Sequence, residues 1–270
     1  MINPIVLHIM ILMLCNISQS KESNNKIPFQ IGERVSYSVY YNWGPIWMRA
    51  ANVDFSIQSE IYKTKPIFKF ISTGSSIPSY DWFFYVRDTF ISYSEKNNLH
   101  SYYYFQNSWE GSVKLKNTLQ FDRFSNTITA RLESSKKATV DTIFDYKPET
   151  RDLLNAVYYC RTINFDSLKI NQTMPIKTVF DDSIYNLYIR FMGKEVITLK
   201  NGRKFNTVKI RAKLIAGTIF TGGEDLEIWI SDDPCRVPIK VVAKILIGKV
   251  QAFVNETENL KYPLSSEIRE

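Results

Sequence analysis

Apolar side chains recur at every second position in many short segments of this chain, and this spacing constrains the fold more than any other feature. Val35, Tyr37, Val39 and Tyr41 alternate with Ser36, Ser38 and Tyr40. Such alternation is typical of a strand with one face buried and one face in solvent. The same spacing returns in residues 53–57, 90–93 (less regularly), 113–115, 184–191, 196–198, 208–212, 226–230 and 250–254.

Short polar segments separate these strands. They are Lys96–Asn98, Arg123–Asn126, Met192–Lys194, Lys200–Arg203 and Asp232–Pro234. Within Lys200–Arg203, both Asn201 and Gly202 tolerate the positive φ of a type I′ hairpin turn. Because parallel neighbours need a longer crossover, the short connections predict antiparallel pairing. A sheet of about a dozen strands must curl, split or close, so we expect a mainly β fold: a half-barrel, a barrel or a two-sheet sandwich.

Two segments have helical character. Pro148–Cys160 is the clearer one, with Thr150 as the expected N-cap and apolar residues from Leu153 to Tyr158 on one face. Residues 79–85 are the second. No linker divides the chain, so we expect one domain over residues 29–262, with the helix closing one end of the sheet and residues 263–270 as a frayed tail.

The first twenty residues have the character of a secretion signal. They contain no charged side chain, and Ile5 to Leu14 is apolar except for His8. This run is too short to span about 30 Å of hydrocarbon but fits the apolar core of a signal peptide. We expect cleavage after Ser20, a flexible leader over residues 21–28, and export to the periplasm or outer envelope, with an uncleaved anchor as the alternative. Lipidation of Cys15 is disfavoured because Leu14 precedes it.

Several function classes are excluded or disfavoured by composition. The chain has two His, of which His8 leaves with the signal peptide, so chemistry that needs a positioned His is nearly excluded. The charge excess is mild, with 34 Lys and Arg against 27 Asp and Glu and no dense basic run, so nucleic acid is not an expected partner. No phosphate-binding loop occurs, and no cofactor or metal site is expected. No further apolar run reaches membrane-spanning length.

Acidic and sulfur-bearing residues are candidates for chemistry, each with a structural alternative. Asp232 and Asp233 could bind Ca²⁺ or share a proton, but a tight turn with Arg236 paired to one carboxylate explains them more simply. Asp181–Asp182 and Glu224–Asp225 are adjacent acids that point to opposite faces of a strand. Cys160 and Cys235 could form a disulfide, although two free thiols are favoured, and a thiol nucleophile formed by Cys160 with His100 is disfavoured.

Aromatic residues are the most distinctive positive feature, with 16 Tyr, 17 Phe and 5 Trp. They cluster in runs such as 80–85 and 102–105, where both faces of a strand would be aromatic or apolar. The sheet is then covered on both faces, or its concave face lines a cavity for an apolar or sugar-bearing ligand. The candidate ligand-binding residues are Trp43, Trp47, Trp82, Phe83 and Phe84 as cavity wall, with Leu154 and Tyr158 on a lid helix.

Several segments together resemble a bacterial exported family, the domain of unknown function 3108. They are 29–33 with Tyr37, 43–44, 152–161, 193–195, 229–238 and 244–248, so the resemblance covers about residues 29–255. It implies a β-rich envelope protein and carries over no catalytic residue, cofactor or activity. The outline is also similar to curved-sheet lipoprotein carriers, an analogy of architecture alone.

Three functions follow from these observations. The first is a non-enzymatic envelope protein that binds a lipid-like or amphiphilic ligand in the concavity of the sheet. The second is a structural or assembly factor that binds another envelope protein through a sheet edge or an aromatic patch. The third is a hydrolase that acts through carboxylates. The ligand, the partner and the oligomeric state are open at this point.

Overall fold

A computed structural model describes residues 27–82, 85–214, 223–245 and 248–269. The predicted signal peptide, most of the leader and Phe83–Phe84 lie outside these ranges. Sixteen strands form one sheet in the described part. The strands are β1 (Arg34–Trp43), β2 (Ile46–Tyr62), β3 (Lys65–Ser76), β4 (Val86–Glu95), β5 (Ser101–Glu110), β6 (Val113–Asp122), β7 (Thr127–Ser134), β8 (Lys137–Asp145), β9 (Arg151–Asp152), β10 (Thr173–Phe180), β11 (Ser183–Thr198), β12 (Lys204–Leu214), β13 (Gly223–Ser231), β14 (Pro238–Lys244), β15 (Lys249–Glu258) and β16 (Glu267–Ile268).

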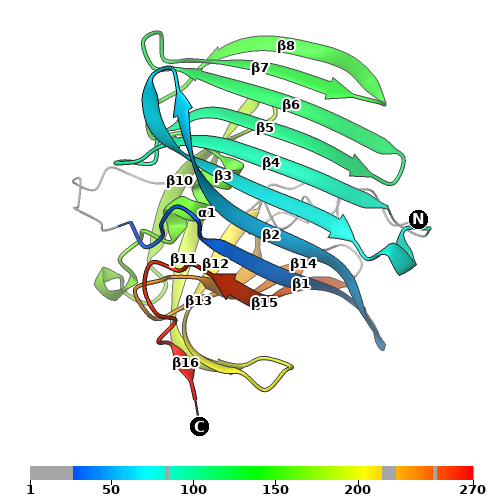
Figure 1. Cartoon of the computed structure of the whole chain (residues 1–270), viewed down its shortest axis with the longest axis vertical. Coiled ribbons are helices and arrows are strands. Elements are labelled where there is room, and N and C mark those ends of the chain that lie inside the picture. Colours follow the sequence, from blue (N-terminus) through cyan, green and yellow to red (C-terminus); the bar gives the residue numbers. More distant parts are fainter. Residues whose placement is uncertain (1–26, 83–84, 215–222, 246–247, 270) are drawn as a thin grey trace.

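The sheet is open, strongly curved and almost wholly antiparallel, which confirms the predicted fold class (Figure 1). Its order runs from β8 down to β1 and continues through β15 to β9, while β16 pairs with β12. Among the described strands, only β9 and β10 pair in parallel. The end of the sheet at β9 and β10 approaches β5 and β6 of the other half, because β9 contacts β5 and Asn117 of β6 donates to Asp181 between β10 and β11 at 2.9 Å. The result is a barrel-like curve that strand pairing does not close.

The single α-helix of the described residues, α1 (Leu153–Cys160), lies inside this curve (Figure 1). It contacts β3, β4, β9 and β10, and six of its eight residues are buried. Tyr158 stacks on Phe70 of β3 with ring centroids 3.9 Å apart, and Phe29 meets the same tyrosine edge-on at 5.2 Å. A helix that is apolar nearly all round is stable only where it is covered on every side, and the concave face supplies that cover.

A buried carboxylate fixes the N-terminal end of α1. Asp152 is the N-cap and accepts from the backbone N–H of Asn155 at 2.9 Å. Its other carboxylate oxygen accepts from the hydroxyls of Ser92 on β4 at 2.8 Å and Ser101 on β5 at 2.6 Å. Burial raises the pKa of Asp152 from 3.8 to about 6, and these hydrogen bonds offset only part of the rise. The cap therefore joins the helix to the opposite side of the sheet.

A buried ion pair fixes the C-terminal end of α1. Arg161 follows the last helical residue and bonds both carboxylate oxygens of Glu33, one of them at 3.1 Å, just before β1. It also donates to the backbone carbonyl of Cys235 at 2.9 Å. Both side chains are almost fully buried, at 4% and 2% exposure. Removal of one partner would leave a buried charge without compensation, so this contact strongly fixes the helix position.

Two local expectations from the sequence are wrong. The helix begins at Leu153 rather than at Pro148, and Asp152 replaces Thr150 as the cap, because residues 151–152 pair with β10 as β9. Met192–Lys194 is not a turn between two strands: β11 runs through it with a bulge after Phe191, where Gly193 has φ +110°. The glycine absorbs the irregularity without ending the strand.

Other connections and termini show smaller differences. The second helical segment is only a 3₁₀ turn at Pro78–Tyr80. Gly202 has φ +86° while Asn201 has no positive φ, so the β11–β12 connection is not a type I′ turn. The end of the chain, expected to fray, instead forms β16, where Arg203 pairs with Glu267 at 2.6 Å.

We predict that Leu154→Ala lowers the free energy of unfolding by about 2–5 kcal/mol, because Leu154 is fully buried and its truncation leaves a cavity. Urea unfolding measured by circular dichroism checks this. Val140→Ala on β8 is the control, since Val140 is 45% exposed and should lose less than about 0.5 kcal/mol. Equal losses in the two variants would contradict the interior position of α1.

We predict that Asp152→Asn changes how stability depends on pH. The folded chain binds the Asp152 proton more tightly than the unfolded chain, so the contribution of this carboxyl is most favourable below about pH 4 and is lost as the pH rises through about 6. Asn keeps a cap oxygen and does not titrate. The stability of the variant relative to wild type should therefore increase by about 3 kcal/mol between about pH 4 and pH 7.

The measurement is urea unfolding of both proteins at a series of pH values. All other titrating groups are shared, so the difference between the two curves isolates Asp152. A difference that does not change with pH would mean that Asp152 titrates normally in the folded chain.

Candidate functional site

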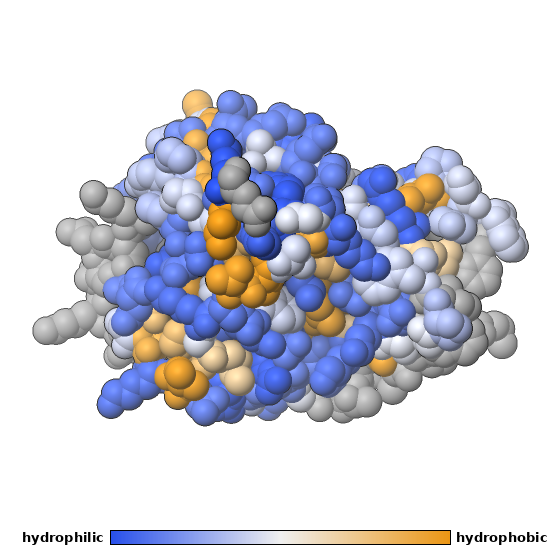
Figure 2. Space-filling model, turned by 90° about the horizontal axis from the view of Figure 1, so that it is seen from below, coloured by the Kyte–Doolittle hydropathy of each residue, from blue (hydrophilic) through white to orange (hydrophobic). Residues whose placement is uncertain are grey.

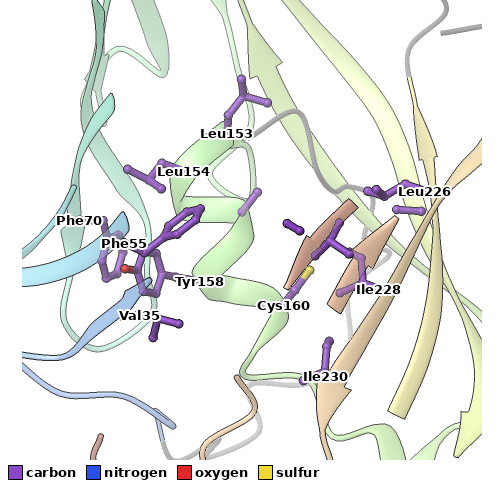
Figure 3. Close-up of a cluster of buried hydrophobic side chains, with 14 of the residues drawn as sticks. Val35, Phe55, Phe70, Leu153, Leu154, Tyr158, Cys160, Leu226, Ile228 and Ile230 are labelled. Carbon is purple, nitrogen blue, oxygen red and sulfur yellow. The ribbon is translucent and has the colours of Figure 1, made fainter. Parts of the chain in front are cut away.

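An apolar cavity of about 50 Å³ lies between α1 and the sheet. By the same measure a water molecule needs about 10–15 Å³, so the cavity exceeds one water and suits a few carbon atoms. Figure 3 shows Val35, Phe55 and Tyr158 on one side and Cys160 facing Ile228 and Ile230 on the other. The residues that line the cavity are Val35, Tyr37, Phe55, Val157, Tyr158, Cys160, Arg161, Ile210, Ile228, Ile230, Pro238 and Val241.

The strands position this lining through their register. Ile228 of β13 lies opposite Ile210 of β12 and Val241 of β14, and paired residues project to the same face of a sheet. These side chains are buried, which identifies the face as the concave one. The polar side chains of the lining make hydrogen bonds, since Tyr37 donates to the carbonyl of Pro238 at 2.9 Å and Arg161 bonds Glu33. The cavity is thus mainly apolar.

Two of the seven residues expected to bind a ligand, Tyr158 and Leu154, lie in or near this cavity, whereas Trp47 lies elsewhere. Tyr158 lines the cavity, and Leu154 is fully buried one turn earlier on α1. Trp47 lies on the convex face, where it stacks on Tyr40 at 5.5 Å and contacts Phe253. The ammonium of Lys200 lies 3.3 Å from the Trp47 ring centroid.

Trp82 and Trp43, two further expected wall residues, lie between strands and at the end of a strand. Trp82 is 83% exposed in the connection between β3 and β4. Trp43 ends β1, and its side chain lies outside the described part, as do Phe83 and Phe84. The structure therefore does not bring Trp47 and Trp82 together with Leu154 and Tyr158, and a ligand contact at any of the expected residues stays a prediction.

A second group of interior residues is polar and was not identified from the sequence. It consists of Asp88 on β4, three residues of β5 (Tyr104, Gln106 and Ser108) and Asn117 on β6, all at most 5% exposed. We call these five residues, with Asp181 of the β10–β11 turn, the polar wall. Asp88 pairs with Ser108 and Gln106 with Asn117 in the sheet register, so these side chains share the concave face.

Hydrogen bonds connect much of the polar wall. Asn117 donates to Asp181 at 2.9 Å and to Gln106 at 3.4 Å. Gln106 donates to the hydroxyl of Ser108 at 3.2 Å. The sequence signal was present as alternating polar residues in β4 and β5. It was ambiguous because the opposite phase of β5 carries Tyr103, Phe105 and Trp109, which are more apolar.

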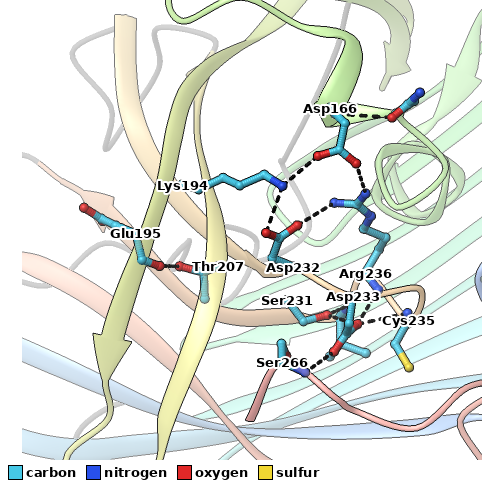
Figure 4. Close-up of polar contacts among 12 residues, drawn as sticks. Asp166, Lys194, Glu195, Thr207, Ser231, Asp232, Asp233, Cys235, Arg236 and Ser266 are labelled. Atoms are coloured by element: carbon cyan, nitrogen blue, oxygen red, sulfur yellow. Dashed lines mark hydrogen bonds and ion pairs between the residues drawn. The ribbon is translucent and has the colours of Figure 1, made fainter. Parts of the chain in front are cut away.

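The acidic motif at Asp232–Arg236 is a structural turn, as expected (Figure 4). Asp233 accepts from the hydroxyl of Ser231 at 2.8 Å, from the Cys235 N–H at 3.0 Å and from the Ser266 N–H at 2.9 Å. Asp232 pairs with Lys194 at 2.9 Å and with Arg236 at 3.6 Å. Both carboxylates are therefore occupied by turn contacts.

The thiols and the histidine also have structural surroundings. Cys160 and Cys235 are buried free thiols, and burial raises the pKa of Cys160 well above its usual value. The Nδ1 atom of His100 accepts a hydrogen bond from Arg123 at 2.8 Å, and the pKa of His100 falls to about 4 because of burial and the neighbouring Arg151 and Arg123. A neutral imidazole held by an arginine and a thiol facing an apolar cavity do not make a nucleophilic pair.

Two further findings concern metals and membranes in the described ranges. No group of three or more His, Cys, Asp or Glu residues there could hold a metal ion. No helix in those ranges has the length and hydropathy to cross a membrane. Seen from below, apolar side chains reach the surface in separate patches among hydrophilic ones (Figure 2).

Comparisons with known proteins agree with this architecture. The crystal structure of a beta-barrel-like protein of domain of unknown function DUF1849 from Brucella abortus matches with a TM-score of 0.53 at 6% identity, covering 86% of this chain and 100% of that chain. That likeness concerns the fold alone. A comparison with curated proteins finds no match. The family model "Protein of unknown function (DUF3108)" matches residues 36–255, and the chain belongs to this family.

Proposed function

We propose that this protein is a non-enzymatic cell-envelope protein that binds the apolar part of a lipid-like or amphiphilic ligand between α1 and the concave face of the sheet. The observation that carries the proposal is the apolar cavity beside Tyr158, Cys160 and Ile228. Interiors of proteins are close-packed. An unfilled apolar space of this size next to a helix is therefore a ready site for apolar atoms.

The size of the cavity limits what it receives. About 50 Å³ suits the end of an alkyl or acyl chain of a few carbons and not a whole lipid. The helix α1 acts as the cover of this space. This gives Tyr158 the role of a ligand contact and leaves Leu154 as packing that holds the cover in place.

Export is the second part of the proposal, and it is supported by the sequence alone. Residues 1–20 carry no charged side chain and contain an apolar run of signal-peptide length. The periplasm or outer envelope, where amphiphiles are abundant, suits a carrier of such ligands.

We predict that filling the cavity removes bound ligand. Ile228→Phe adds volume to a lining position that is only 4% exposed, so alkyl chains lose their space. The measurement is native mass spectrometry of the chain from Lys21 to Glu270, purified from a bacterial periplasm, followed by solvent extraction and by titration of the stripped protein with octanol. The wild-type protein should carry an adduct of lipid mass or bind octanol. The affinity of the variant for octanol should be about tenfold lower or more.

Val196→Phe is the matched control, because Val196 on β11 is 57% exposed. Val241→Phe fills the cavity from β14 and replaces Ile228→Phe in the test if that variant does not fold. Far-UV circular dichroism reports whether each variant folds. A clean protein mass together with no octanol binding would contradict the proposal. It would favour partner binding, for which the end strand β8 offers exposed Val140 and Ile143.

We predict that residues 1–20 direct export. The full chain expressed in bacteria should appear in the periplasmic or envelope fraction with a mass that begins at Lys21, because signal peptidase removes the leader. The chain that starts at Lys21 should stay in the cytoplasmic fraction. Retention of the full-length mass in the cytoplasm would overturn the export proposal without affecting the ligand proposal.

A further inference from the structure

The polar wall is unusual for the interior of a β-barrel-like fold. Asp88, Gln106 and Asn117 are at most 5% exposed, although polar side chains are expensive to bury unless they are hydrogen-bonded. They face the same concavity as the apolar cavity, because Asp88 shares its face of β4 with Phe90 and Ser92. Ser92 in turn bonds Asp152, the cap of α1.

Acidic groups converge on this region from three elements. Asp88 comes from β4, Asp152 from the start of α1, and Asp181 from the β10–β11 turn, where Asn117 donates to it at 2.9 Å. Burial and the negative charges of Asp152, Asp181 and Asp88 raise the pKa of Tyr104 well above its usual value. The phenol therefore lies in a negative electrostatic field created by all three carboxyls.

The buried hydroxyl of Tyr104 is an independent observation that points to a ligand here. Its hydroxyl is buried, with the residue 2% exposed, and has no hydrogen-bond partner. The hydroxyl of Ser72 on β3, at 0% exposure, likewise has no partner. Buried hydroxyl groups without partners are rare because each costs free energy. A ligand group that accepts or donates a hydrogen bond here would remove that cost.

We propose that the polar wall binds a cationic group of the ammonium class, with Asp88 and Asp181 as counter-charges and Tyr104 as a hydrogen-bond partner. The inference rests on the proposed function for the apolar part of the ligand and names its polar end as positively charged. An ammonium fits because it supplies several donors to carboxylate, amide and phenol oxygens. A carboxylate or phosphate head group would instead meet like charges.

The test compares probes that share one tail and differ in head group. Octylammonium, octanol and octanoate are titrated into the stripped chain Lys21–Glu270 near neutral pH, with binding measured by calorimetry. A fourth probe, 1,4-diaminobutane, carries ammonium groups without the long tail. We expect octylammonium to bind at least about tenfold more tightly than octanol, and octanoate to bind most weakly.

Two variants assign the effect to the polar wall. Asp181→Asn removes a charge, and Asn tolerates the φ of +53° at this position. The variant should bind octylammonium about tenfold more weakly and should bind octanol as wild type does. Asp182→Asn, at the exposed neighbouring residue, is the matched control and should change neither. Tyr104→Phe deletes a hydroxyl without a partner, so it should weaken octylammonium several-fold without lowering stability.

The outcomes separate the two proposals. Equal binding of the three octyl probes, or octylammonium binding that is insensitive to both variants, overturns the inference and leaves the proposed function intact. Binding of 1,4-diaminobutane that depends on Asp181, with no binding of octanol, supports the cationic site and overturns the apolar one. No binding by any probe overturns both.

Discussion

The burial of α1 inside a strongly curved sheet is the constraint on which the rest of this structure depends. A sheet of sixteen strands that curls without closing leaves a concave face, and the apolar side chains on that face need a partner. The helix supplies it with an apolar surface nearly all round. The ring of Tyr158 packs between Phe70 of β3 and Phe29, which precedes β1. Without the helix the inner face would be exposed to water.

The interior that results has two different sides. Next to β12, β13 and β14 it is lined by Ile210, Ile228 and Val241 and contains an unfilled apolar space. Next to β4, β5 and β6 it presents the polar wall. The helix lines the apolar space, and its cap, Asp152, bonds Ser92 and Ser101 on the polar side. An interior with an apolar side and a polar side is complementary to a molecule that has the same division, which is the reason to consider an amphiphile rather than a simple hydrocarbon.

The sequence could predict the architecture because strand alternation and short turns are local signals. It could not predict the interior, because that depends on contacts between distant residues. Thr150 and Asp152 are both good caps, and Asp152 is selected by the pairing of β9 with β10 and by the hydroxyls of Ser92 and Ser101, which lie 60 and 51 residues earlier. In β5 both phases carry aromatic residues, so periodicity does not reveal that the phase with Gln106 faces inward. The exposure of Trp82 likewise follows from where its loop lies and not from its type.

The buried charges at the two ends of α1 explain how an unfilled cavity persists beside a helix. An apolar helix on an apolar surface has no strongly preferred position, and sliding toward the cavity would improve packing. Arg161 and Glu33 oppose that movement, because separating them would leave charges buried without partners. Asp152 does the same at the other end through its bonds to β4 and β5. The polar contacts thus determine the position of the helix more than they add to stability, and the space beside Cys160 is retained because the helix is held at both of its ends.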